Sequence, residues 1–158
     1  MTPGEPVLTT RHVPLTSEVA LALIQALNAE LSATYPEPGA THFRLDPDEV
    51  AQGRGAFLVA FDGDTPVGCG GIRRIDEARA ELKRMYVAPP HRGRGIGALL
   101  LRNLEDAARA LGVRQVVLET GIRQGAALEL YRRAGYEEIE PFGEYLGSEL
   151  SMCLGREL

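Results

Sequence analysis

The segment from Glu81 to Gly97 constrains the fold of this chain more than any other. A strand-like run, Glu81 to Val87, is followed by two prolines and by a glycine-rich loop that leads into a helical pattern. Glycine tolerates positive φ angles and leaves space beside the backbone, and the first N–H groups of a helix attract anions. The loop residues are Arg92, Gly93, Arg94, Gly95, Ile96 and Gly97. We therefore expect a strand, a loop and a helix that bind a diphosphate, with two arginines adding positive charge.

Two common diphosphate motifs can be compared with this loop. It is not a Walker loop, because no Gly-Lys-Ser/Thr follows the glycines. Gly93 to Ala98 does fit the G-x-G-x-x-A dinucleotide fingerprint, and Glu119 ends the next expected strand. That fingerprint begins directly after its strand and usually opens a domain, whereas here five residues intervene and about 60 follow. A dinucleotide-binding oxidoreductase is therefore the weaker interpretation of the loop.

The rest of the chain shows a change of hydrophobic period. Apolar residues at helical spacing predict a helix from about Thr16 to Leu31, and Asp46 begins a second, short helix with a capping box. Further helices are expected at 96–111 and 127–134, and strands at 7–12, 56–61, 66–72, 81–87, 115–119, 136–139 and 148–154. This order, with a hairpin followed by β-α-β-α-β, predicts a mixed α/β (α+β) fold in which helices flank one sheet.

Length and charge limit the class of protein. A chain of 158 residues with 44% apolar and 25% charged residues is long enough for one domain with a core, so we expect a single domain over 1–158. The net charge of −5 disfavours nucleic acid and anionic membranes as partners and is compatible with a cationic amine. No apolar run approaches the roughly 18 residues of a membrane helix.

Cysteine usage and the N-terminus indicate a cytoplasmic protein. Cys69 and Cys153 lie far apart and lack CxxC spacing, so neither a disulfide scaffold nor a metal site is expected. We expect both to be buried core residues. No secretory signal is visible at the N-terminus.

Three motifs resemble the GCN5-related N-acetyltransferase (GNAT) superfamily. The glycine loop resembles the family signature [RQ]-x-x-G-x-[GA], and Met85 to Pro89 resembles the family's fourth strand and its exit. Gln124 to Tyr136 resembles the helix motif N-x-x-A-x-x-L-Y-x-x-x-G-[FY], with Gln124 in place of the usual asparagine. The resemblance covers about residues 56–140.

The resemblance implies a fold and a cosubstrate. The fold would be a mixed, mostly antiparallel sheet of about seven strands, flanked by helices and splayed between the fourth and fifth strands. The cosubstrate would be acetyl-CoA, with its pyrophosphate on the backbone of Arg92 to Gly97 and its pantetheine arm beside Met85, Tyr86 and Val87. Gln124 would contact that arm through its side-chain amide.

The resemblance also implies catalytic roles. Tyr131 matches the tyrosine that protonates the departing thiolate, which makes it a better leaving group. A protonated amine cannot attack a thioester, so a base must remove its proton. Glu81 matches a catalytic glutamate of the family; Glu119 and a water chain are the alternatives. A backbone N–H of the fourth strand would polarise the acetyl carbonyl.

The acceptor is left open by the sequence. The implied reaction is direct transfer to a primary amine of a small molecule or protein, by a protein that can form homodimers. Transfer of another acyl group, a hydroxyl acceptor and a non-catalytic CoA sensor are the alternatives. His42, Phe43 and Arg44, and the loop with Phe142, Glu144 and Tyr145, are expected near the acceptor site, where each could equally be structural.

Overall fold

The computed structural model describes residues 7–38 and 45–158. Its strands are β1 (Leu8–His12), β2 (Gly55–Asp62), β3 (Thr65–Arg74), β4 (Arg79–Val87), β5 (Gln115–Gly121), β6 (Glu137–Glu138) and β7 (Ser151–Glu157). Its α-helices are α1 (Glu18–Thr34), α2 (Ile96–Ala110) and α3 (Gly125–Arg133). Short 3-10 helices are η1 (Pro47–Val50), η2 (Pro89–His91) and η3 (Gly143–Tyr145).

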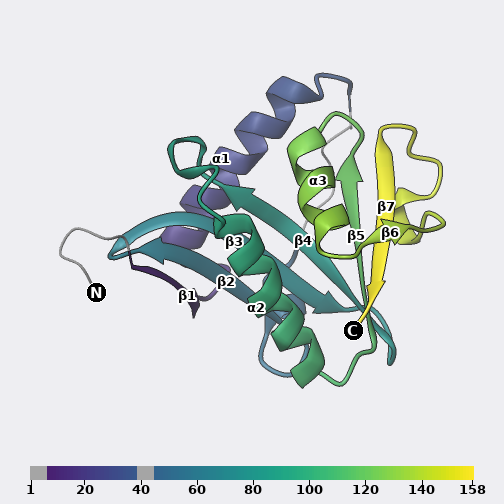
Figure 1. The fold of residues 1–158 in the computed structure, drawn as a ribbon, viewed down its shortest axis with the longest axis horizontal. Coiled ribbons are helices and arrows are strands. Elements are labelled where there is room, and N and C mark those ends of the chain that lie inside the picture. Colours follow the sequence, from purple (N-terminus) through teal and green to yellow (C-terminus); the bar gives the residue numbers. More distant parts are fainter. Residues whose placement is uncertain (1–6, 39–44) are drawn as a thin grey trace.

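All strands of the described residues lie in one sheet, in the order β1-β2-β3-β4-β5-β7-β6 (Figure 1). Neighbouring strands are antiparallel except for β4 and β5, which are parallel. The parallel pair is the point where α2 connects one half of the sheet to the other, since parallel neighbours need a crossover. The mixed, mostly antiparallel sheet of seven strands predicted from the sequence is confirmed.

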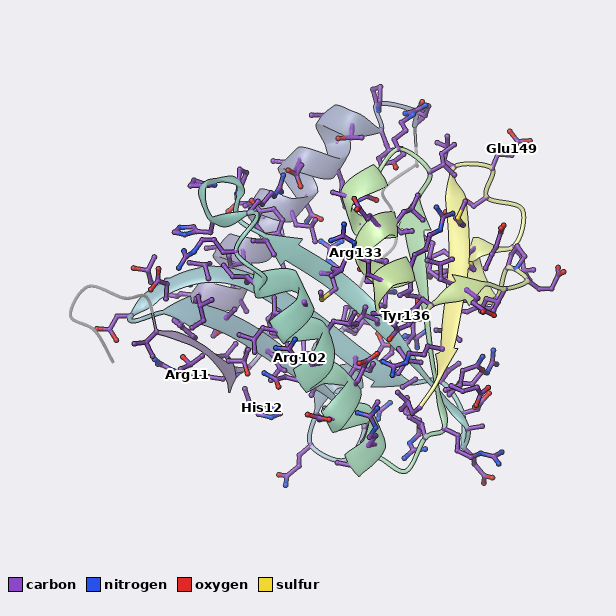
Figure 2. The ribbon with its side chains drawn as sticks, viewed as in Figure 1. Arg11, His12, Arg102, Arg133, Tyr136 and Glu149 are labelled. Atoms are coloured by element: carbon purple, nitrogen blue, oxygen red, sulfur yellow. The ribbon has the colours of Figure 1, made fainter. Side chains whose placement is uncertain are left out.

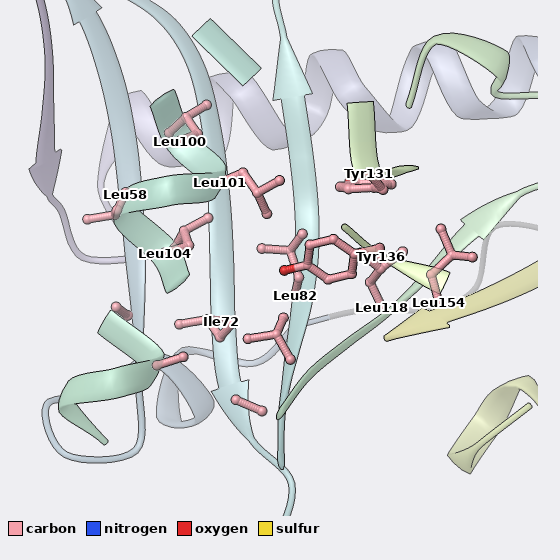
Figure 3. Close-up of a cluster of buried hydrophobic side chains, with 14 of the residues drawn as sticks. Leu58, Ile72, Leu82, Leu100, Leu101, Leu104, Leu118, Tyr131, Tyr136 and Leu154 are labelled. Carbon is pink, nitrogen blue, oxygen red and sulfur yellow. The ribbon is translucent and has the colours of Figure 1, made fainter. Parts of the chain in front are cut away.

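The helices cover opposite faces of the sheet. The apolar side of α2 packs with α3 on one face, where Leu100, Leu104 and Tyr131 join the same buried cluster (Figure 3). The other face carries α1, whose Leu23 and Leu27 belong to a second buried cluster together with Phe57. Helix α1 starts where the Ser17 hydroxyl accepts a hydrogen bond from the Ala20 N–H at 3.3 Å, an ordinary N-cap. Two apolar layers therefore hold the sheet between the helices.

Strands β4 and β5 separate over half their length. They are paired from Arg79 and Gln115 as far as Leu82 and Leu118, and no further. Beyond that point the remaining residues of β5 pair only with β7, on the other side. Figure 1 shows the two strands adjacent near the C-terminus of the chain and diverging towards α3. The end of β4 therefore has backbone on one side without a strand neighbour, which confirms the predicted splay.

Some boundaries differ from those expected. The last strand begins at Ser151 rather than Ser148, because residues 148–151 form a turn in which the Ser151 N–H donates to the Ser148 carbonyl at 3.3 Å. The preceding strand shortens to Glu137–Glu138. The short helix after Asp46 is a 3-10 helix, and its capping box is present, with the Glu49 carboxylate accepting from the Asp46 N–H at 3.0 Å.

None of the helices in the described part of the chain is long and apolar enough to cross a membrane.

Candidate active site

A cavity opens where β4 and β5 separate. Its walls come from α1, β4, β5, α3 and the loop before β7. The lining residues are Leu27, Leu31, Tyr35, Leu82, Lys83, Arg84, Met85, Glu119, Thr120, Gly121, Gln124, Ala127, Tyr131, Tyr145, Leu150 and Ser151. Because it lies at the splay, the cavity joins the open side of β4 to the face covered by α1.

A β-bulge in β4 shapes the floor of this cavity. Gly71 pairs with Lys83 and Cys69 pairs with Tyr86, so Arg84 and Met85 together face a single residue of β3. Arg84 has φ of 60°, the only positive φ of a non-glycine residue among those described. Bulges of this kind often re-aim a strand beside a functional site.

The bulge is held by its neighbours. The Cys69 thiol donates to the Arg84 carbonyl at 3.4 Å. Opposite the bulge, a Cβ at Gly70 would lie 2.5 Å from the Met85 sulfur, so the glycine makes room for that side chain. The extra residue moves Met85 to the α2 face and Tyr86 to the α1 face. Both cysteines are free and buried, as expected, and burial raises the pKa of the Cys69 thiol to about 12.

The glycine loop presents unused backbone donors. Gly93 and Gly95 have φ of 82° and 79°, and a Cβ at either would meet nothing within 4 Å, so the space beside the loop is open. In the described part of the chain, no hydrogen bond uses the N–H groups of residues 93–98, and Leu99 donates the first helical bond, to Gly95. Unpaired amides at the start of a helix are suited to bind an anion.

The side chains of the two loop arginines form hydrogen bonds and ion pairs with neighbouring elements. Arg92 donates to the Val87 carbonyl at 2.9 Å and pairs with Glu30 of α1 at 2.6 Å. Arg94 pairs with Asp62 at 3.0 Å. These contacts anchor the loop to β4, α1 and β2. Backbone amides are therefore the groups that the loop offers to an anion in this structure, and the arginines add their charge nearby.

Tyr131 and Gln124 bring α3 to the cavity. Tyr131 is 5% exposed, and its ring lies edge-on to that of Tyr136 at 5.9 Å between centroids (Figure 3). Its hydroxyl makes no hydrogen bond within the described residues, and burial raises its pKa. The Gln124 side-chain carbonyl accepts from the Gly121 N–H at 3.0 Å, so this residue caps the end of β5.

Glu81 lies on β4 beside the cavity but does not contribute to its lining. It is 1% exposed, and its carboxylate accepts from Arg73 at 3.0 Å and from the Tyr145 hydroxyl at 2.5 Å. Arg73 also pairs with Glu49 at 2.6 Å. Both Glu81 oxygens are thus occupied by protein donors.

Glu119 lies on the cavity wall at the end of the paired part of β5. Burial, followed by repulsion from Glu81 and Glu144, raises the pKa of Glu119 to about 7, against the lowering effects of a Ser151 hydrogen bond and of Lys83. A carboxylate with a pKa near neutrality suits a general base. The structure therefore brings Tyr131 and Glu119 into one cavity and places Glu81 behind it.

The candidates in the loop before β7 lie in or beside the cavity. Tyr145 lines the cavity and Glu144 reaches Lys83 at 3.3 Å, while Phe142 stacks edge-on against Tyr145. His42, Phe43 and Arg44 lie outside the described residues. Sequence reasoning missed Arg84 and Tyr35 as cavity residues. Nothing in the local pattern marks Arg84, because its orientation depends on the bulge.

Comparison with known proteins identifies the family. The sequence profile described as the acetyltransferase (GNAT) family matches residues 21–136. The chain belongs to the GNAT family. Like the relatives that carry the name acetyltransferase, it is an N-acetyltransferase.

Three relatives illustrate the range of the GNAT match. An IAA acetyltransferase from Azospirillum brasilense is 39% identical over 149 residues, covering 94% of this chain and 95% of that protein. The N-alpha-acetyltransferase RimI of Mycobacterium tuberculosis is 39% identical over 94 residues, 58% of each chain. A Klebsiella pneumoniae structure described as an acyl-CoA N-acyltransferase has a TM-score of 0.81 at 33% identity, covering 96% of this chain and 98% of that one.

Some solved structures with this fold contain acetyl-CoA or coenzyme A. One, from Elizabethkingia anophelis, has acetyl-CoA bound and a TM-score of 0.68 at 18% identity, over 96% of this chain and 98% of that one. The features that such a ligand needs are present here: open amides at residues 93–98, space beside Gly93 and Gly95, and a strand end at Met85–Val87 without a neighbour in β5. The residues of this chain therefore fit coenzyme A.

Proposed function

We propose that this protein transfers an acetyl group from acetyl-CoA directly to a primary amine of a small molecule or protein. The observation that carries the proposal is the cavity at the splay, where Tyr131 and Glu119 face one space that continues along the open side of β4. An acid for the leaving group and a base for the nucleophile are the two groups that such a transfer needs.

The coenzyme would be held mainly by backbone. The N–H groups of residues 93–98, at the start of α2, would bind the pyrophosphate. Met85, Tyr86 and Val87 would bind the pantetheine arm as a neighbouring strand, with Gln124 beside it. The coenzyme supplies the activated acetyl thioester.

Glu119 is the base that the geometry favours. With a pKa of about 7, it is largely ionised in mildly alkaline solution and can accept the proton of an ammonium group in the cavity. Glu81 is held by Arg73 and Tyr145, so it would have to break hydrogen bonds to act. Its role here is to orient Tyr145 and to raise the pKa of Glu119 by repulsion.

Tyr131 would donate its proton to the sulfur as the thiolate leaves. Its hydroxyl has no hydrogen-bond partner among the described residues, and its raised pKa keeps it protonated at neutral pH. A protonated phenol beside a departing thiolate lowers the charge that develops in the transition state. The bulge at Arg84 and Met85 puts irregular backbone at the same point, where an N–H can polarise the acetyl carbonyl.

An amine screen with thiol detection tests the proposal. Purified protein with acetyl-CoA should release CoA only when an amine acceptor is present, and the acetylated amine should appear in equal amount by mass spectrometry. Product with a longer acyl-CoA but not with acetyl-CoA would favour the alternative acyl donor. Tight CoA binding without product from amines or alcohols would favour a sensor and would overturn the transfer.

A further inference from the structure

The cavity contains an arginine, Arg84, that has no acidic partner in the part of the chain that the structure describes. Arg84 lines the cavity, and its guanidinium hydrogen-bonds to the Asn28 side-chain oxygen of α1 and forms no ion pair within the described residues. Among the described residues, the groups whose charge affects its pKa are the Cys69 thiol and the Tyr145 phenol, and neither is a carboxylate. Partial burial lowers that pKa, so the charge is desolvated and not compensated.

The neighbouring cations are compensated. Lys83, the residue before it, pairs with Glu144 at 3.3 Å. Arg73, on the adjacent strand, contacts both Glu49 and Glu81 at less than 3 Å. A desolvated cation without a counter-ion is unfavourable, and an arginine fork matches the geometry of a carboxylate. Arg84 is therefore suited to bind an anionic group of a ligand.

The same cavity carries the opposite charge on another wall. Glu119 lies across the splay on β5, with a pKa raised towards neutrality by burial. The lining of the same cavity also includes apolar side chains, with Leu27 and Leu31 from α1 and Leu150 from the loop before β7. An occupant that satisfies all three features has an amine, a carboxylate and an apolar body.

We infer that the acceptor is an amino acid with an apolar side chain, whose carboxylate binds Arg84 and whose amine faces Glu119. This rests on the proposed acetyl transfer and narrows its acceptor class. The ammonium group loses one proton to Glu119. Its nitrogen then forms the C–N bond of the amide as the C–S bond of the thioester breaks, and the thiolate takes a proton from Tyr131. As the amide forms, the nitrogen loses a second proton, which reprotonates the Tyr131 phenolate. Glu119 then releases its proton to solvent, so the reaction releases one proton in total.

Binding to the CoA-saturated protein tests the inference without turnover. Calorimetric titrations would compare L-leucine with L-leucinamide and 3-methylbutylamine, which keep the amine and the apolar body but lack the carboxylate. Methionine and phenylalanine with their amides would be the second and third sets. A charge-assisted pair of this kind predicts that at least one amino acid binds about 10- to 100-fold more tightly than its amide.

Arg84→Gln should abolish that preference while leaving CoA affinity within about twofold of wild type. The matched control is Arg109→Gln, which removes an arginine paired with Asp106 on α2 and should keep the preference. If Arg84→Gln does not fold, the comparison of acids with amides on the wild-type protein still decides the matter.

The outcomes separate the two proposals. Acetylation of simple amines with no preference for the acids overturns the amino-acid inference and leaves acetyl transfer intact. A preference for the acids that Arg84→Gln retains also overturns the assignment of Arg84. Failure of the protein to bind CoA at all overturns both.

Discussion

Replacing Glu119 with glutamine should make the protein more stable in alkaline solution, although it removes the proposed base. In the folded protein, burial raises the pKa of this carboxyl from 4.5 to about 7. The folded state therefore binds more protons than the unfolded state between these values. Since the unfolding free energy falls with pH wherever the folded state holds the extra proton, the wild type loses stability as pH rises through this range.

The size of the effect follows from the shift. A pKa shift from 4.5 to about 7 corresponds to an upper limit of about 3 kcal/mol in unfolding free energy, reached above the folded-state pKa. Partial exposure of Glu119 reduces this to about 1–2 kcal/mol. Glutamine cannot ionise, so Glu119→Gln should exceed the wild type by about 1–2 kcal/mol at pH 8.5. Well below pH 4.5, where the carboxyl is protonated in the folded and the unfolded state, the difference should approach zero.

Urea denaturation at the two pH values measures this difference directly. The control is Glu138→Gln on β6, an exposed carboxylate that should give the same small difference at both values. A stability gain for Glu119→Gln that does not change with pH would refute the burial argument.

The activity of wild type should rise with pH to a plateau above about 7, and Glu119→Gln should lose about 10²- to 10⁴-fold in kcat. Survival of the same pH profile in the variant would move the base elsewhere, to Glu81 or water.

Three further substitutions test other parts of the structure. Tyr131→Phe should lower kcat by about 10²-fold or more with little change in acetyl-CoA affinity or melting temperature, because its hydroxyl has no partner to lose among the described residues. Gly70→Ala should lower the unfolding free energy by about 1–3 kcal/mol, since its Cβ would lie 2.5 Å from the Met85 sulfur, whereas Gly125→Ala, with open space around it, should be neutral in the same denaturation assay. Glu105→Gln should cost about 1–3 kcal/mol by thermal unfolding, because the buried carboxylate accepts two hydrogen bonds.

Each of these three predictions can be contradicted by a specific result. Full turnover in the Tyr131 variant would remove its acid role. Equal stability of the Gly70 and Gly125 variants would mean that the bulge tolerates a side chain opposite it. An unchanged melting temperature for Glu105→Gln would mean that its hydrogen bonds contribute nothing net.

Most of the fold was predictable because helices, hairpins and turns depend on patterns of residues that are close together in the sequence. The helices α1, α2 and α3 and the hairpin of β2 and β3 follow from apolar spacing, caps and turns. The strand expected at residues 7–12 is β1, which the structure places at an edge of the sheet, where Figure 2 shows Arg11 and His12. Boundaries near β6 and β7 were less predictable because a turn at residues 148–151 replaces strand pairing.

The site was predictable only in part, for a physical reason. Tyr131 and the glycine loop belong to sequence motifs, and the structure brings Tyr131 to the cavity. The preference between Glu81 and Glu119 depends on tertiary partners. Arg73 and Tyr145 donate hydrogen bonds to the Glu81 carboxylate, whereas Glu119 lies on the cavity wall. No pattern in β4 alone reveals the bulge that sets the path of Arg84.

The most direct test is a thermal-shift titration with acetyl-CoA, CoA, NAD and NADPH side by side. A ligand that binds only the folded state at a hundred times its Kd adds about 2.7 kcal/mol to the unfolding free energy, which is readily seen as a rise in melting temperature. We expect acetyl-CoA and CoA to stabilise the protein and the dinucleotides to have little effect. Stabilisation by NAD or NADPH with no response to CoA would contradict the assignment of the β4–β5 cavity and of the amides at residues 93–98 to acetyl-CoA.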